Sequence, residues 1–305
     1  MLKRIIFIVG PTAIGKSEAA VYLAKKIGAE IISCDSMQVY KGMDITTSKP
    51  KPALRNKVKH HLLGVIPLSR DYDVSAYRKD ALKKVKEIVS RGKVPLFVGG
   101  TGLYLSVLKD GIFEEDINDK PIRDKLYRIA KGRGSLYLYD QLKKVDPDAA
   151  EKIHPNDTKR IIRALGVFKA TGKPISALQK KRQGLRDEYN LRIICLNMER
   201  SKLYKKIDKR VDLMFKDGLI KEVQGILKKD LSRTASFAIG LREVKGYLKG
   251  DYGIEEAKAR VKLNTRRYAK RQLTWFRKDK EIIWINLREE DTPVKISRRI
   301  WKKLF

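Results

Sequence analysis

The chain has 305 residues, 42% of them hydrophobic and 34% charged, which is enough apolar material for a folded core. The sequence has no apolar run of about 18 residues, as a membrane span needs, and the apolar start is too short for a signal peptide. Lys and Arg total 69 against 36 Asp and Glu, a formal net charge of +33. Enzymes that act only on small neutral metabolites need no such excess, whereas a nucleic-acid partner explains it.

The charge has an alternative explanation, a lysine-rich surface like those of thermophiles, although such surfaces usually balance Lys with Glu. Cys34 and Cys195 are the only cysteines, too few to hold a metal cluster by themselves. We expect a cytoplasmic protein that keeps both thiols reduced, acts as a monomer and has no membrane partner.

Strand-like and helix-like segments alternate over roughly the first 110 residues. The apolar run 5–9 predicts a buried parallel strand, and 16–27 predicts a helix with an apolar face. Strands are predicted again at 30–34 and 94–98, on either side of a helix at 74–91. This order predicts an α/β fold, a P-loop NTPase-like parallel sheet flanked by helices.

The pattern changes after Gly111, because residues 117–189 are polar, basic and helical in periodicity. A strand-like run returns at 192–196, and the mostly helical last third contains one more at 282–287. We therefore expect a core domain of residues 1–114 and 191–305, with basic C-terminal helices. A helical insertion domain of residues 115–190 is expected to contact the nucleic-acid partner.

The first predicted strand leads into a phosphate-loop motif: Gly, four residues, Gly, Lys, then Ser or Thr. Loop N–H groups and the helix N-terminus attract phosphate oxygens, while Lys16 contacts the terminal phosphate and the Ser17 hydroxyl helps to hold Mg²⁺. The motif predicts a pyrophosphate ligand and Mg²⁺ as cofactor, but not a nucleoside triphosphate in particular. The expected binding residues are Gly10, Pro11, Thr12, Ala13, Ile14, Gly15, Lys16 and Ser17.

The next predicted strand leads into Asp35 and Ser36. A carboxylate at a strand's carboxyl end, beside a phosphate loop, lies where ligands bind in such sheets. Asp35 is therefore a candidate metal partner or general base. The alternative is a helix N-cap, since Asp-Ser often has that role after a strand.

Five stretches together resemble the tRNA dimethylallyltransferases, also called isopentenyl-pyrophosphate transferases, and the similarity covers nearly the whole chain. The first is the phosphate loop, and the second and third are Asp-Ser-Met-Gln-Val-Tyr at 35–40 and Gly-Gly-Thr-Gly-Leu-Tyr at 99–104. The fourth is His-Pro-Asn-Asp at 154–157 with Arg160 and Arg163. The fifth is Arg-Arg-Tyr-Ala-Lys-Arg-Gln-Leu-Thr-Trp-Phe at 266–276.

The resemblance implies transfer of a dimethylallyl group from dimethylallyl pyrophosphate to the exocyclic 6-amino group of the adenosine just 3′ of the tRNA anticodon. It also implies that Asp35 is the general base and Thr101 its partner at the reacting centre. A base is needed because the lone pair of the amino group is delocalised into the ring. For Thr101 the alternative is a turn hydroxyl between glycines.

The resemblance implies further contacts. Arg200 would clamp pyrophosphate and Gln38 would read the target base, the alternatives being surface salt bridging and a surface amide. The implied tRNA-binding residues are Asp35, Ser36, Met37, Gln38, Thr101, Arg123, Lys159, Arg160, Ile161, Ile162, Arg163, Gly240, Arg242, Arg267 and Arg271.

The chain departs from the family pattern at two places. After Ile45 the family commonly has Gly-Thr-Ala-Lys-Pro, whereas this chain has Thr-Thr-Ser-Lys-Pro at 46–50. Thr46 lacks the freedom of glycine at positive φ, so we expect altered backbone geometry there. Leu241 replaces a tyrosine, which predicts the loss of an aromatic contact.

Residues 258–280 hold ten Lys or Arg and a single acid, Asp279. Helical periodicity places the aromatic residues on a face that also carries Val261 and Ala269, which predicts that they pack in the core. The basic residues, among them Arg266, Arg267 and Lys270, fall on the rest of the circumference and are expected to follow a phosphate backbone. Binding to acidic lipid is the alternative.

The residues alone leave two other functions possible. One is an enzyme that prenylates free adenosine nucleotides, against which the charge and the insertion speak. The other is a phosphate-loop, NTP-driven nucleic-acid-binding protein without prenyl chemistry, against which the motifs at 35–38 and 99–102 speak.

Overall fold

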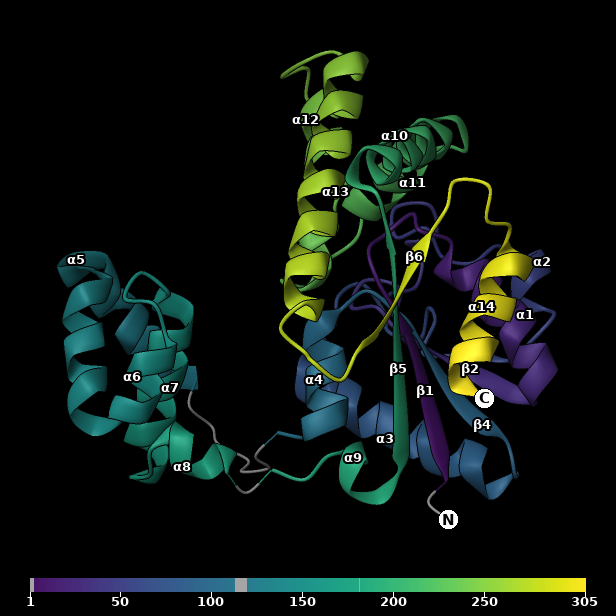
Figure 1. The fold of residues 1–305 in the computed structure, drawn as a ribbon. Helices are drawn as coiled ribbons and strands as arrows, with labels where there is room; N and C mark the ends of the chain where they lie inside the picture. Colours follow the sequence, from purple (N-terminus) through teal and green to yellow (C-terminus); the bar gives the residue numbers. More distant parts are fainter. Residues whose placement is uncertain (1–2, 113–119, 181) are drawn as a thin grey trace. The chain divides into compact units, whose positions relative to one another are not determined.

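A computed structural model describes residues 3–112, 120–180 and 182–305 of the chain (Figure 1). The chain divides into two compact units, one of residues Met1–Lys109 with Glu188–Phe305 and one of Asp110–Asp187, here called the core unit and the helical unit. The boundaries fall at 109–110 and 187–188, against the 114–115 and 190–191 expected from the sequence.

A six-stranded parallel sheet organises the core unit, in the order β3-β2-β4-β1-β5-β6. This confirms the predicted fold class. The short strand β3 was not predicted, because its two histidines form no apolar run. The strands are β1 (Arg4–Val9), β2 (Ala29–Cys34), β3 (His60–His61), β4 (Val94–Gly99), β5 (Asn190–Met198) and β6 (Ile283–Leu287).

Helices cover both faces of the sheet (Figure 1), which is why β1 and β2 are buried along almost their whole length and consist mostly of apolar residues. On one face α1 (Lys16–Ile27) packs against α14 (Pro293–Leu304), and on the other α3 (Val74–Ser90) packs against β2 and β4. The core unit also contains α2 (Pro52–Arg55), α4 (Gly102–Asp110), α10 (Arg200–Lys216), α11 (Leu219–Leu227), the 3₁₀ turn η1 (Ala235–Phe237), α12 (Leu241–Leu248) and α13 (Ile254–Phe276). A short helix, α9 (Leu185–Glu188), ends where β5 begins.

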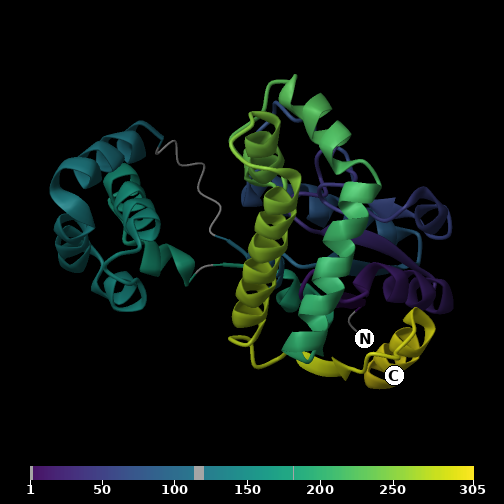
Figure 2. The ribbon, with the colours of Figure 1, turned by 90° about the horizontal axis from the view of Figure 1, so that it is seen from above.

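The register of the sheet brings the carboxyl ends of β1, β2 and β4 together at one edge, beside β5. Gly99 of β4 lies between Val9 of β1 and Cys34 of β2, and Val9 pairs on its other side with Cys195 of β5. The segments that follow β1, β2 and β4 therefore leave the sheet together, and we call this place the catalytic edge. Two long helices, α10 and α13, run side by side in the core unit (Figure 2) and send side chains to this edge.

The helical unit consists of α5 (Lys120–Val145), α6 (Pro147–Lys152), α7 (Thr158–Thr171) and α8 (Ile175–Gln179). Its own apolar core includes Leu138, Leu142 and Leu165, each at most 2% exposed. Asp146 closes the unit by accepting hydrogen bonds from the backbone N–H groups of Ala149 and Ser176. No helix in the described part of either unit is long and apolar enough to cross a membrane.

Candidate active site

The phosphate loop connects β1 to α1 and is shaped by left-handed backbone at Ala13, with φ of 64°. At Gly10, where φ is 141°, a Cβ would lie 2.6 Å from the carbonyl oxygen of Leu196 in β5, so only glycine fits. The Lys16 ammonium folds beneath the loop and donates to the carbonyl oxygens of Gly10 (2.9 Å) and Pro11 (2.7 Å). The loop is thus held in shape by its own lysine.

A second cation, Arg210 of α10, lies beside Lys16. Its Nη1 donates to Thr12 Oγ1 of the loop (3.0 Å), and its Nε donates to Ser48 Oγ (2.8 Å). Burial and the neighbouring charge of Arg210 together lower the pKa of Lys16 to about 8, although Asp35 acts in the opposite direction. Burial also lowers the pKa of Arg210. Two desolvated cations at one loop stabilise a bound polyanion strongly.

Asp35 follows β2 and is anchored by one of its two carboxylate oxygens. Oδ1 accepts from the backbone N–H groups of Met37 (2.9 Å) and Gln38 (3.3 Å), which closes the turn 35–38. Within the described residues Oδ2 makes no hydrogen bond, so it is the oxygen that can accept a proton from a substrate. The structure thus combines the two alternatives, because the side chain caps a turn and still presents a free carboxylate oxygen.

Thr101 lies next to this turn, after β4. Its Oγ1 accepts from the Ser36 N–H (3.0 Å), and its own N–H donates to the Cys34 carbonyl oxygen (3.1 Å). Its hydroxyl also interacts with Tyr268 of α13, whose pKa is raised by burial. Thr101 therefore ties the Asp35 turn to both β4 and α13.

The inner face of α13 meets the catalytic edge closely. Gln272 accepts from the Thr12 N–H (3.0 Å) and donates to the Gly100 carbonyl oxygen (2.9 Å), which joins the phosphate loop to the turn after β4. A Cβ at Gly102 would lie 2.2 Å from the Trp275 ring. Close approach of this helix explains the glycines around Thr101, and the Gln272 bond shows that one loop N–H is already used by the protein.

Ser17 lies in the first turn of α1 and lines a small pocket of about 10 Å³ together with Ser33, Gln38 and His60. The described residues contain no group of three or more His, Cys, Asp or Glu side chains that could hold a metal ion. A divalent cation would therefore take Ser17 and the oxygens of a bound pyrophosphate as ligands, a donor set that suits Mg²⁺.

The residue expected to clamp pyrophosphate, Arg200, lies at the start of α10. Arg200 is exposed and donates to the Tyr204 hydroxyl (3.0 Å), and within the described residues it makes no contact with the phosphate loop. Arg210 makes that contact instead. It lies between Ile207 and Val211 on the buried side of the helix, so an arginine among apolar residues was the available signal.

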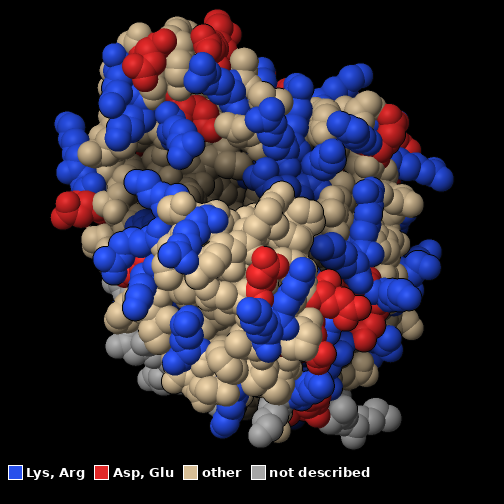
Figure 3. All heavy atoms as spheres, turned by 90° about the vertical axis from the view of Figure 1, so that its left-hand side faces the viewer, with Lys and Arg blue, Asp and Glu red and all other residues tan. Residues whose placement is uncertain are grey.

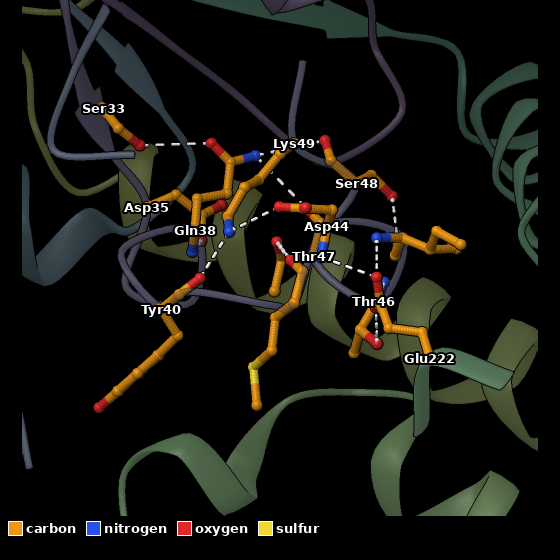
Figure 4. Close-up of polar contacts among 12 residues, drawn as sticks. Ser33, Asp35, Gln38, Tyr40, Asp44, Thr46, Thr47, Ser48, Lys49 and Glu222 are labelled. Carbon is orange, nitrogen blue, oxygen red and sulfur yellow. Dashed lines mark hydrogen bonds and ion pairs between the residues drawn. The ribbon is translucent and has the colours of Figure 1, made fainter. Parts of the chain in front are cut away.

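Three other expected site residues make contacts within the protein that the motifs did not reveal. Gln38 accepts from Ser33 Oγ (3.3 Å) and donates to the Thr47 carbonyl oxygen (3.3 Å), so its amide already binds protein (Figure 4). Ile161 and Ile162 are 0% exposed and pack inside the helical unit, because they lie on the apolar face of α7.

The other expected tRNA contacts are divided between the two units. Arg123, Lys159, Arg160 and Arg163 belong to the helical unit, where Arg160 also pairs with Asp157 (3.3 Å). Gly240 and Arg242 lie at the start of α12 in the core unit, with Arg242 exposed. Blue Lys and Arg side chains far outnumber acidic ones over the face drawn in Figure 3.

The basic residues of α13 do not all lie on its solvent-exposed face. Arg267, Lys270 and Arg271 are exposed as predicted, but Arg266 is paired with Asp208 of α10. Arg266 therefore joins two helices and does not contribute to the free basic face. Ala269 and Phe276 are 0% exposed, which confirms that this side of the helix belongs to the core.

Comparison with known proteins identifies the family. A sequence model described as IPP transferase matches residues 38–279, most of the chain. The chain belongs to this family. A tRNA dimethylallyltransferase of Halothermothrix orenii is 46% identical over 290 residues, which cover 94% of this chain and 88% of that one.

Two solved structures are similar in fold to this chain. The full-length tRNA isopentenylpyrophosphate transferase of Bacillus halodurans is 40% identical, with a TM-score of 0.72 over 100% of this chain and 97% of the other. A eukaryotic dimethylallyltransferase described as acting on tRNA is 29% identical, with a TM-score of 0.78 over 93% and 74%. Both the helical unit and the core unit fall within these matches.

Proposed function

We propose that the protein transfers a dimethylallyl group from dimethylallyl pyrophosphate to the exocyclic 6-amino group of the adenosine 3′-adjacent to the anticodon in tRNA. The proposal rests mainly on one observation. The carboxylate of Asp35 lies near the cations Lys16 and Arg210 at the catalytic edge and interacts with both electrostatically. Family membership and curated relatives that are tRNA dimethylallyltransferases support it.

The proposed chemistry is a displacement at the first carbon of the allyl group. The adenine nitrogen forms the new bond to that carbon as the bond to the pyrophosphate oxygen breaks. Asp35 Oδ2 accepts the proton that the amino group loses, and Thr101 holds the Asp35 turn in place. Lys16, Arg210 and the loop N–H groups stabilise the charge that develops on the departing pyrophosphate.

Mg²⁺ is proposed to bind at Ser17 together with the substrate oxygens, where it would add positive charge beside the leaving group. The protein's own residues orient the reactants around this site. The allyl carbon gains cationic character as its bond to oxygen breaks, so exclusion of water from the edge protects the reaction.

The tRNA is proposed to bind along basic residues of both units, among them the exposed Arg267 and Arg271 of α13 and, in the helical unit, the exposed Lys159 and the half-buried Arg123. Contacts of this kind hold the phosphate backbone without reading sequence. Gln38 is proposed to act on the target base through its neighbours in the turn, since its amide already bonds to protein.

The experiment offers radiolabelled dimethylallyl pyrophosphate with tRNA, with adenosine monophosphate, or alone. We expect label to enter tRNA at a single adenosine and inorganic pyrophosphate to be released in equal amount. Transfer to the free nucleotide with none to tRNA would indicate an adenylate prenyltransferase. ATP hydrolysis stimulated by tRNA, without label transfer, would indicate the NTP-driven binding protein.

A further inference from the structure

A loop of the core unit, residues 43–49, lies between the phosphate loop and α11 and holds the second oxygen partner of Arg210. Ser48 Oγ accepts the Arg210 Nε–H at 2.8 Å, while Thr12 Oγ1 of the phosphate loop accepts from Nη1 at 3.0 Å. A guanidinium has five N–H groups in one plane. Two fixed acceptors on different loops therefore set the direction of that plane and leave three N–H groups for an anion.

The loop itself is held from α11 by Glu222. The two carboxylate oxygens of Glu222 accept from three successive backbone N–H groups, those of Asp44 (2.9 Å), Ile45 (2.8 Å) and Thr46 (2.7 Å). The Thr46 hydroxyl adds a fourth bond at 2.6 Å. Figure 4 shows Glu222 below this turn and Ser48 beyond it on the same loop.

Ser48 cannot easily turn away from Arg210. Its φ is 47°, in the left-handed region, and its N–H donates to the Ile45 carbonyl oxygen at 2.9 Å. Its hydroxyl hydrogen has the Ile45 carbonyl oxygen (3.5 Å) and Met214 Sδ (3.7 Å) as acceptors, which leaves a lone pair for the arginine. From the other side, Lys49 bonds to the Tyr40 carbonyl oxygen (2.5 Å) and to Asp44 (2.8 Å).

The structure shows which residue of the loop adopts a positive φ. The left-handed residue of the loop is Ser48 and not Thr46, so the threonine needs no positive φ. Thr46 is 7% exposed and its hydroxyl is used by Glu222. The two residues that depart from the Gly-Thr-Ala pattern are thus the two whose hydroxyls build the support of Arg210.

We propose that Ser48 is a positioning residue of the pyrophosphate site, which aims Arg210 at the phosphate loop and is itself held by Glu222 through Thr46. The inference rests on the proposed role of Arg210 in binding pyrophosphate. Ser48 touches no substrate, so its contribution is to the affinity for the pyrophosphate group and not to the bond-making step.

The test is the change Ser48→Ala, which removes the hydroxyl that accepts from Arg210 and leaves the backbone of the loop in place. We expect the Kd for inorganic pyrophosphate and the KM for dimethylallyl pyrophosphate to rise roughly ten-fold, as for the loss of one charge-assisted hydrogen bond. The transfer rate at saturation and the Kd for tRNA should not change. Glu222→Gln should act in the same direction, because an amide cannot accept hydrogen bonds at both of its ends.

A double-variant comparison separates positioning from a general loosening of the fold. In an Arg210→Ala background, Ser48→Ala should have no further effect on pyrophosphate binding. The matched control is Ser90→Ala, which removes a hydroxyl bonded to the Glu87 carbonyl oxygen at the end of α3 and should leave all constants unchanged. An equal effect of Ser48→Ala with and without Arg210, or no effect at all, would overturn the proposal. Normal pyrophosphate binding by Arg210→Ala would instead refute the role proposed for Arg210, and the positioning role with it.

Discussion

At the catalytic edge, the cations Lys16 and Arg210 are half-buried and each donates to oxygens of the protein, whereas on the outer face of α13 the side chains of Arg267, Lys270 and Arg271 are exposed to solvent. Desolvated cations interact strongly with one anion in one geometry. Solvated cations are screened by salt, and each adds a small, similar amount to the binding of a polyanion. We therefore expect single changes at the edge to alter substrate binding or the chemistry, and changes on the outer face of α13 to alter only the tRNA affinity and its salt dependence.

The largest effect is expected at Asp35. The change Asp35→Asn keeps an Oδ1 that can accept from Met37 and Gln38, but it removes the carboxylate that accepts the proton. Loss of a general base typically lowers the rate by about 10²–10⁴-fold. Single-turnover transfer at saturating tRNA measures this, with tRNA affinity as the control. A rate near that of the unmodified enzyme would remove Asp35 from the mechanism.

A smaller effect is expected where the inner face of α13 touches the edge. In Gly102→Ala the new Cβ would lie 2.2 Å from the Trp275 ring, so the helix or the ring must move. Overpacking of this kind costs about 1–3 kcal/mol of folding free energy. Urea unfolding followed by tryptophan fluorescence measures the cost, with Gly132→Ala, which meets nothing within 4 Å, as the matched control. Equal stability of the two variants would show that α13 approaches the edge less closely than described.

The pH dependence of substrate binding should report Lys16 directly. Its pKa is lowered to about 8, so above this pH the free enzyme loses the ammonium charge that a bound pyrophosphate would stabilise. Affinity for dimethylallyl pyrophosphate should be constant below pH 8 and fall above it, by up to about ten-fold per pH unit. Calorimetric titration between pH 7 and 9.5 measures the trend. Lys16→Arg, which stays charged, should lose the dependence, and an unchanged profile in this variant would assign it to another group.

The smallest effect is expected on the outer face of α13. Each side chain that binds a phosphate contributes about 0.7–0.9 to the slope of log affinity against log salt, so Arg267→Ala with Arg271→Ala should reduce that slope by about 1–2. Arg271 is exposed, and its guanidinium lies 5.8 Å from the centre of the half-buried Tyr268 ring, a weak contact whose removal the core should tolerate. Filter binding across a salt series measures the slope for several tRNAs. The same slope as the unchanged enzyme would mean that this face is only solvated.

The contrast between the two regions also explains what the sequence could and could not predict. The phosphate loop, the position of Asp35 after a strand, and the strands β1, β2 and β4 follow from contiguous motifs and apolar runs, because neighbouring residues decide them. The order of the strands in the sheet was not predicted, since it depends on tertiary packing. Arg210, Ser48 and Gln272 could not be assigned, since their partners lie more than 150 residues away in the chain and meet only through tertiary packing. The exposed cations on α13 were predicted from helical periodicity. The ion pair of Arg266 was not, because its partner Asp208 lies on the neighbouring helix α10.

The division of labour between the edge and α13 is tested most directly by single-turnover transfer to tRNA, measured against tRNA concentration at fixed salt. The account predicts that the variant lacking Arg267 and Arg271 needs more tRNA but reaches the rate of the unchanged enzyme at saturation. It predicts that Asp35→Asn stays slower by about 10²-fold or more at every tRNA concentration. A double variant that remains slow at saturating tRNA, or an Asp35→Asn enzyme whose rate is restored by more tRNA, would contradict it.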